Sequence, residues 1–175
     1  NAFTLFFGSY YFKDKQIYKI SKKILEQELV EQILDDGAHF ELSPMYHKIL
    51  LIKVLDCIQL INNNSWQNDN LKTVLKNKAI SMLGWLDSIG YKNNSIPNLN
   101  DSTCRVTPSS NKIFKYAKNL NIQWDGINLS SSGYRKWNNK DAEFFIDVSN
   151  ICADYIPGYS HADTFNFEFY YKEEP

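Results

Sequence analysis

The spacing of apolar side chains along the first 120 residues is that of helices. Between residues 15 and 34, apolar residues recur every three or four positions, and lysines and glutamates fill the positions between them. The stretch 44–61 has so little polar surface that we expect the helix it predicts to be enclosed by others. The run 71–86 and the residues after the Thr107–Pro108 pair predict two more helices, and the first twelve residues resemble the middle of a helix.

Beyond residue 125 the period of the pattern changes from about 3.6 to 2. In "AEFFIDV" (142–148) and "TFNFEFYY" (164–171), apolar residues alternate with mainly polar ones, which predicts β-strands that each have one apolar face. Helices followed by strands, rather than alternating with them, indicate separate layers or domains. We expect the boundary between Asn119 and Ser130, with residues 1–125 forming a helical domain and residues 126–175 the start of a β domain.

Composition narrows the class of protein. The chain has 175 residues, 43% of them apolar, and a formal net charge of −1, which favours a cored protein over a disordered one and provides no broad basic surface for nucleic acid. No apolar stretch is long enough to span a membrane. The cysteines have neither a complete pair set nor a metal-binding spacing, so we expect buried thiols at Cys57, Cys104 and Cys152.

Residues 35–50, "DDGAHFELSPMYHKIL", gather candidate chemistry at the predicted start of a helix. Ser43 reads as the helix cap and Pro44 as the first helical residue, which places Tyr46 in the first turn. The positive end of the helix dipole favours an anion there, so Tyr46 would lose its proton more readily and serve as a proton shuttle, with His39 as a nearby cation or base. The alternative is structural: His39 and His47 cap helix ends and Tyr46 packs in the core. The amphipathic pattern does not decide between them.

Two longer segments carry a family resemblance. The segment 31–61, "EQILDDGAHFELSPMYHKILLIKVLDCIQLI", closely resembles the "DGxHxExSPxYH" region of heparinase II/III-like polysaccharide lyases, and the segment 154–175, "DYIPGYSHADTFNFEFYYKEEP", resembles their "PGHxHAD" region. The order and separation of the two segments also match. The resemblance implies part of an α/α toroid followed by the first antiparallel strands of a β-sandwich, and therefore an internal fragment of a longer protein.

The resemblance implies a lyase that cleaves uronic-acid-containing polysaccharide by β-elimination. In this reaction the proton next to the carboxylate is removed and the bond to the following sugar breaks. Tyr46 matches the catalytic tyrosine, as the acid and also as a candidate base, and His39 is implied to contact substrate or assist the base. The other implied substrate-binding residues are Glu41, His47, Asn100, Asp101 and Tyr159; Glu41 and His47 alternatively orient the catalytic groups, and turn formation explains Asn100 and Asp101 equally well.

Two further features follow from the resemblance. Tyr159 stands where the family often has another histidine of the cleft, and His161 matches a ligand of a structural zinc in some relatives, although zinc requires three or four ligands. The chemistry itself requires no cofactor. The family's Asn-His pair, which is expected to neutralise the substrate carboxylate, precedes the part that matches "NAFTLFFGSYYF", so we expect this chain alone to be inactive. The implied partners are an acidic polysaccharide and the remainder of its own chain, with the bacterial periplasm or cell envelope as the compartment.

Two alternatives remain open. One is a non-catalytic protein that binds carbohydrate or associates with surface polysaccharide, as the tyrosine at position 159 suggests. The other is a toroid-type glycoside hydrolase, which needs two carboxylates that face the scissile bond. Glu41 and Asp101 are the one attractive pair for that chemistry.

Overall fold

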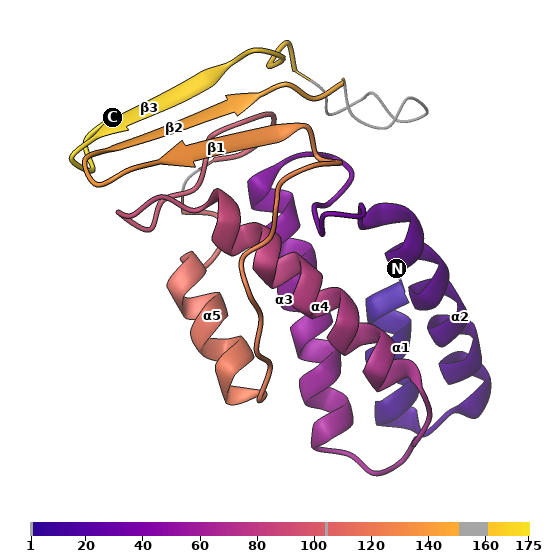
Figure 1. Ribbon diagram of the computed structural model, residues 1–175. Helices are drawn as coiled ribbons and strands as arrows, with labels where there is room; N and C mark the ends of the chain where they lie inside the picture. The colour runs from indigo at the N-terminus through magenta and orange to yellow at the C-terminus, as the bar shows by residue number, and fades with distance from the viewer. Residues whose placement is uncertain (1, 104, 151–160) are drawn as a thin grey trace.

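The computed structural model describes residues 2–103, 105–150 and 161–175. Within them the chain forms helices and then strands: α1 (Ala2–Phe12), α2 (Lys15–Gln32), α3 (Pro44–Asn62), α4 (Leu71–Ile89), α5 (Ser110–Asn119), β1 (Tyr134–Asn138), β2 (Ala142–Asp147) and β3 (Phe167–Tyr171). The strands form one antiparallel sheet in the order β1-β2-β3, which lies across one end of the helices (Figure 1). The predicted fold class, helices followed by antiparallel strands, is confirmed.

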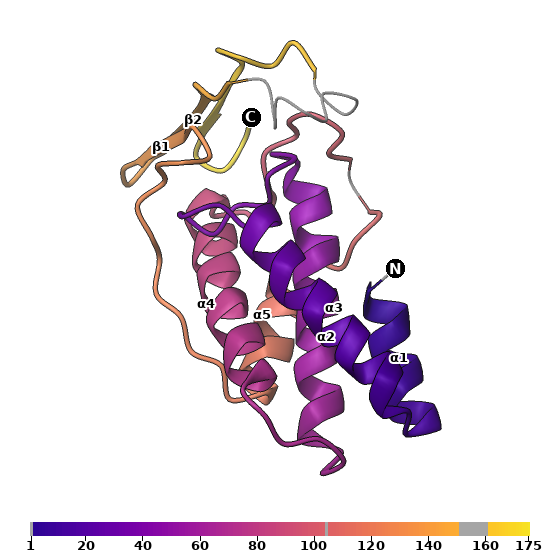
Figure 2. The same ribbon diagram turned by 90° about the vertical axis from the view of Figure 1, so that its right-hand side faces the viewer.

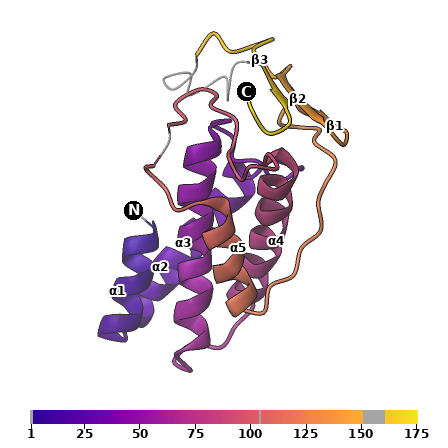
Figure 3. The ribbon, with the colours of Figure 1, turned by 90° about the vertical axis from the view of Figure 1, so that its left-hand side faces the viewer.

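Helix α3 is the enclosed helix that its apolar sequence predicts. It lies between α1 on one side and α4 on the other (Figures 2 and 3). Its buried side chains Leu51, Val54 and Leu55 belong to the same core as Leu75 and Met82 of α4. None of the helices in the described ranges is both long and apolar enough to cross a membrane.

The predicted start of α3 is also confirmed. Pro44 is the first helical residue, and the Ser43 side chain accepts a hydrogen bond from the Tyr46 backbone N–H at 3.4 Å. Helix α5, by contrast, begins at Ser110, two residues after the predicted Pro108, because Ser109 is still extended, with ψ at 153°. The predicted start is therefore accurate for α3 and two residues early for α5.

A buried carboxylate joins the helices to the segment that leads into the sheet. Asp36, in the turn after α2, is 5% exposed. Its Oδ2 accepts hydrogen bonds from the backbone N–H of Ser130 at 2.9 Å and of Ser132 at 2.8 Å, and from the Ser132 hydroxyl at 2.6 Å. Burial alone would raise the pKa of Asp36, but these hydrogen bonds and that of Ser131 outweigh it and lower the pKa.

Close packing holds the same turn against α4 and β1. Gly37 has a φ of +83°, and a Cβ there would lie 2.2 Å from the backbone oxygen of Ser81, so no other residue fits this approach. Tyr134 of β1 is fully buried, lies 6.0 Å from the Trp85 ring, and donates its hydroxyl hydrogen to the Leu42 carbonyl. The loop between α2 and α3 therefore has a fixed position relative to the sheet.

The sheet turns its more polar face toward the helices. The predicted alternation is confirmed, since Glu143, Phe145 and Asp147 of β2 are buried while the residues between them are not. The buried Glu143 is paired with Lys136, whose Nζ lies 3.1 Å away, and the buried Asp147 accepts the backbone N–H of Ser149 at 2.7 Å. The opposite face exposes the aromatic side chains Trp137, Phe167, Phe169 and Tyr171. Strand β1 was not predicted as a strand, because "YRKWN" lacks a clear apolar alternation.

We expect Asp36→Asn to lower the free energy of unfolding by about 2–4 kcal/mol, because an amide replaces a buried acceptor that faces several donors. Urea unfolding followed by circular dichroism measures the change. Asp35→Asn is the matched control, since Asp35 is the exposed neighbour, and it should shift stability by less than about 0.5 kcal/mol. Equal effects of the two substitutions would show that the Asp36 carboxylate does not stabilise the contact between the turn after α2 and residues 130–132.

Candidate functional site

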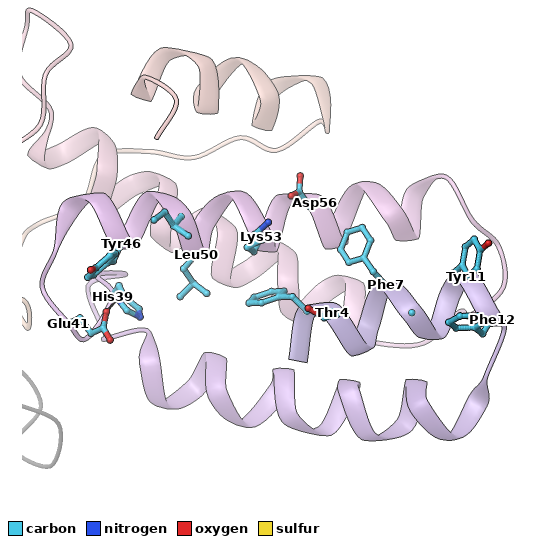
Figure 4. A pocket seen from close by; sticks show the side chains of 13 residues that line it. Thr4, Phe7, Tyr11, Phe12, His39, Glu41, Tyr46, Leu50, Lys53 and Asp56 are labelled. Carbon is cyan, nitrogen blue, oxygen red and sulfur yellow. Dashed lines mark ion pairs between the residues drawn. The ribbon is translucent and has the colours of Figure 1, made fainter. Parts of the chain in front are cut away.

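A pocket of about 960 Å³ lies between α1 and α3 and reaches the loop that precedes α3 (Figure 4). His39, Glu41 and Tyr46 line the end of the pocket near that loop. Helix α3 contributes residues at spacings of three or four, which places them on one face of the helix. These are Tyr46, Ile49, Leu50, Lys53 and Asp56, and helix α1 contributes Phe3, Thr4, Phe7, Gly8, Tyr11 and Phe12.

Tyr46 lies in the first turn of α3, as predicted, and its side chain is half-buried at the pocket. Its hydroxyl donates a hydrogen bond to Asp101 Oδ2 at 3.4 Å. This length is weak for a hydrogen bond, but catalytic hydrogen bonds often tighten only when substrate is bound. The hydroxyl therefore does not pack in the core, which disfavours the structural alternative for Tyr46.

His39 lies beside Tyr46 at the pocket but is only 6% exposed. Burial lowers the pKa of its ring to about 4. The Glu41 carboxylate is 3.8 Å from Nδ1, a pair that is ionic only when His39 is protonated, and burial disfavours that form. Among the described residues, Nδ1 has no hydrogen-bond partner. Near neutral pH, His39 is thus an uncharged base candidate, and the alternative in which it supplies a cation is not supported.

Glu41 lines the same end of the pocket and is half-buried. Burial, and then the negative charge of Asp101, raise the pKa of Glu41. The two carboxylates are therefore close enough to influence each other's ionisation, although Asp101 is not itself a lining residue of the pocket.

His47 has a different environment from His39. Its ring is 0% exposed and lies 4.4 Å from the Trp85 ring. Nδ1 accepts a hydrogen bond from the His39 backbone N–H at 3.2 Å, so Nε2 carries the proton that is donated to the Met82 carbonyl at 3.0 Å. Burial lowers the pKa of His47 to about 3.

These contacts favour the orienting role over the substrate-binding role among the two that the sequence left open for His47, and its part in catalysis stays a prediction. A ring with no exposed surface, and with both nitrogens engaged by backbone groups, does not reach a sugar. What His47 does is hold the backbone of His39 against α4, which is the orienting role that the sequence left open as the alternative.

Next to Tyr46, hydrogen bonds join residues that are far apart in the sequence. Asn100 donates from Nδ2 to the Leu42 carbonyl at 3.0 Å, and its Oδ1 accepts from the His161 backbone N–H at 3.3 Å. Asp101 Oδ1 lies 2.6 Å from His161 Nε2. The Asn100 amide thus ties two loops together, and the predicted sugar contact by Asn100 stays a prediction. Tyr159 lies outside the described residues.

The described residues do not fit a zinc site. Among them, no group of three or more histidine, cysteine, aspartate or glutamate side chains is placed to hold a metal ion. His161 Nε2 is already bonded to Asp101, and Asp163 accepts the backbone N–H of Asn100. The predicted role of His161 as a zinc ligand stays a prediction. Cys57 is buried, as expected, and burial raises its pKa to about 12, whereas Cys104 and Cys152 lie outside the described ranges.

Sequence reasoning missed the pocket residues farther along α3. Lys53 and Asp56 lie seven and ten residues after Tyr46. The helical spacing from Tyr46 was the signal that could have found them, because residues at i+7 share a face with residue i. The aromatic residues of α1 had no such signal.

We expect the ring signals of His39 and His47 not to titrate between about pH 8 and about pH 5.5, because burial keeps both rings neutral. Proton NMR of the ring hydrogens measures this, with assignments from His39→Asn and His47→Asn. The protein in urea is the control, where both histidines should titrate near their ordinary value of about 6.5. A His39 signal that titrates near that value in the folded protein would contradict its burial.

The same histidines make the fold sensitive to acid. The unfolded chain binds protons at these rings below about pH 6.5, whereas the folded chain does so only near pH 4 and pH 3. The unfolded state therefore holds more protons in that window. The stability that the neutral rings provide is complete above about pH 6.5 and declines as the pH falls from there toward 4.

Comparisons with known proteins agree with this architecture. The model "Heparinase II/III N-terminus" matches residues 11–126, and the model "Heparinase II/III-like, C-terminal" matches residues 121–175. A heparinase III with methylated lysines superposes with a TM-score of 0.76 at 16% identity, over 99% of this chain and 30% of that chain. A further heparinase III gives 0.69 at 19% identity, over 99% and 32%.

Heparan sulfate lyase HepC from Pedobacter heparinus is also similar, with a TM-score of 0.70 at 19% identity, over 99% of this chain and 30% of that chain. No curated protein matches the sequence. The chain thus spans about a third of the length of these solved structures, and at such identities the likeness is one of fold. The two family models together match residues 11–175, which include α2 to α5, the loop before α3 and the sheet, and the chain belongs to the heparinase II/III-like family.

Proposed function

We propose that the protein is a polysaccharide lyase that cleaves uronic-acid-containing polysaccharide by β-elimination, with Tyr46 as the general acid and base. The observation that carries the proposal is the position of the Tyr46 hydroxyl, half-buried at the pocket, bonded to Asp101 and beside the neutral ring of His39. Family membership supports the reaction class, since similar solved structures are a heparinase III and a heparan sulfate lyase.

The chemistry of elimination suits these groups. A base removes the weakly acidic proton next to the uronate carboxylate, and an acid protonates the oxygen of the departing sugar. The Tyr46 oxygen can take this proton as its own hydroxyl hydrogen passes to Asp101, and the phenol so formed can give a proton to the leaving oxygen when both lie on the same side of the ring. We propose that His39, which is uncharged near neutral pH and lines the same end of the pocket, assists the first step.

An acidic polysaccharide also requires cations. Lys53 is the lysine that lines the pocket among the described residues, and it lies seven residues from Tyr46, about 10 Å along the helix axis. At that distance it faces a neighbouring sugar rather than the one at Tyr46. We infer that residues 1–175 alone do not turn over substrate, because the group that neutralises the reacting carboxylate is not among these pocket residues.

A glycoside hydrolase is the second candidate, and one observation favours it. Glu41 and Asp101 lie close enough for the charge of Asp101 to raise the pKa of Glu41. A carboxyl group with a raised pKa beside an ionised one is the arrangement of an acid and its partner in glycosidases. The product distinguishes the reactions, because elimination creates an unsaturated uronate and hydrolysis does not.

We expect the full-length protein to release products that absorb in the near ultraviolet from an acidic polysaccharide, and Tyr46→Phe to lower kcat by about 10²–10⁴-fold, since the proton-transfer group is lost. The assay is the rise in absorbance of the unsaturated uronate. Tyr171→Phe, on the exposed face of the sheet, is the matched control and should leave kcat unchanged.

Three outcomes would contradict the proposal. Reducing ends that accumulate without ultraviolet absorbance would identify a hydrolase. Binding of polysaccharide with neither product would identify a carbohydrate-binding protein. Elimination at full rate by Tyr46→Phe would remove Tyr46 from the mechanism.

A further inference from the structure

We propose that Asp101, held by His161, is a positioning residue that orients the Tyr46 hydroxyl for proton abstraction. The proposal rests on the proposed lyase function and deepens it. The three side chains form one hydrogen-bonded chain: His161 Nε2 lies 2.6 Å from Asp101 Oδ1, and the Tyr46 hydroxyl lies 3.4 Å from Asp101 Oδ2. They come from the first turn of α3, from the loop between α4 and α5, and from the segment before β3.

The direction of the hydrogen bond between Tyr46 and Asp101 determines what these three side chains can do. An ionised carboxylate only accepts hydrogen bonds, so the hydroxyl hydrogen of Tyr46 points toward Asp101. As a lone pair on the other side of the phenol oxygen takes the proton from substrate, the hydroxyl hydrogen passes to Asp101 Oδ2, so that Tyr46 stays neutral. That hydrogen returns to Tyr46 when the phenol protonates the departing oxygen. A donor at position 101 would instead occupy a lone pair and leave the hydroxyl hydrogen facing the sugar.

The backbone fixes Asp101 relative to Tyr46. Asn100, on one side, donates to the Leu42 carbonyl at 3.0 Å. Ser102, on the other side, has its hydroxyl 3.1 Å from that of Ser43 and accepts the Met45 backbone N–H at 3.2 Å. Both neighbours of Asp101 are therefore bonded to the residues around the start of α3, so the distance from Asp101 to Tyr46 does not depend on a flexible side chain alone.

Binding of substrate by itself would not favour an aspartate here. The negative charge of Asp101 already raises the pKa of Glu41, and it would repel the carboxylate of a uronate in the same pocket. Each oxygen of Asp101 is engaged by a protein group, one by Tyr46 and one by His161. A carboxylate that opposes binding yet contacts the catalytic hydroxyl is explained by a role in positioning that hydroxyl.

Kinetics of the full-length protein on an acidic polysaccharide test the proposal. We expect Asp101→Asn to lower kcat by about 10–100-fold with KM within about twofold, because the substitution changes the acceptor of the Tyr46 hydroxyl hydrogen and not a contact to substrate. His161→Gln should lower kcat by a smaller factor, and the double variant should be no slower than Asp101→Asn, because the two residues act through one path. If the two substitutions lower kcat by independent factors that multiply in the double variant, the two residues do not act through one path and the proposal is overturned. A rise in KM with kcat unchanged would also overturn it and would indicate a contact between Asp101 and the sugar.

NMR of protein labelled at the tyrosine ring carbon that bears the hydroxyl tests the hydrogen bond without activity. The signal absent in Tyr46→Phe belongs to Tyr46, and it should shift in Asp101→Asn and less in His161→Gln, whereas the Tyr171 signal stays in place. An unmoved Tyr46 signal would overturn the proposal. A shift in a protein that lacks elimination activity would instead overturn the proposed function and leave the hydrogen-bonded chain standing.

A chelator distinguishes positioning from metal binding by His161. Under the proposal, EDTA leaves kcat unchanged in both the wild type and His161→Gln. A loss in the wild type that equals the His161→Gln loss, and that zinc restores, would assign His161 to a metal and overturn its role beside Asp101.

Discussion

The site depends on the burial of the Asp36 carboxylate between the helices and the segment that enters the sheet. A buried charge is costly unless donors surround it, and here three hydrogen bonds converge on a single oxygen. The interaction is directional, so it fixes where residues 130–132 lie against the turn after α2. Tyr134 extends the same contact through its bond to Leu42. Groups from the helices and from the segment before β3 can then meet at Tyr46, which lines the pocket.

The three histidines differ in solvent exposure and in the partners of their ring nitrogens. His47 is fully enclosed, uses both nitrogens on backbone groups, and holds the loop in place. His39, one hydrogen bond away, is nearly as buried but keeps one nitrogen without a partner among the described residues, at the pocket wall. His161 is half exposed and pairs with Asp101. The same side chain is thus structural, a base candidate or a positioning group, according to solvation and to the partners of its ring nitrogens.

The sequence predicted the features that depend on interactions between residues near each other in the chain. Helical spacing gave the helices, and Ser43 with Pro44 gave the start of α3 and hence the place of Tyr46, because capping depends on neighbours in the chain. It did not predict that Asp101 lies between Tyr46 and His161, since those pairs are 55 and 60 residues apart and only the folded chain brings them together. The sequence left two roles open for His47 for the same reason: its burial comes from Trp85 and Met82 of another helix.

The orientation of the sheet shows why the alternating pattern was insufficient. Apolar residues of β2 and β3 share one face, as expected, yet the face that packs on the helices carries Glu143 and Glu168. These charges are tolerated because each has a partner, Lys136 for Glu143 and the Tyr91 hydroxyl for Glu168. Apolar contacts are non-directional and would allow the sheet to slide over the ends of the helices. Paired polar groups allow one register, and a hydroxyl, a carboxylate and an imidazole from separate elements need one register to stay within hydrogen-bonding distance.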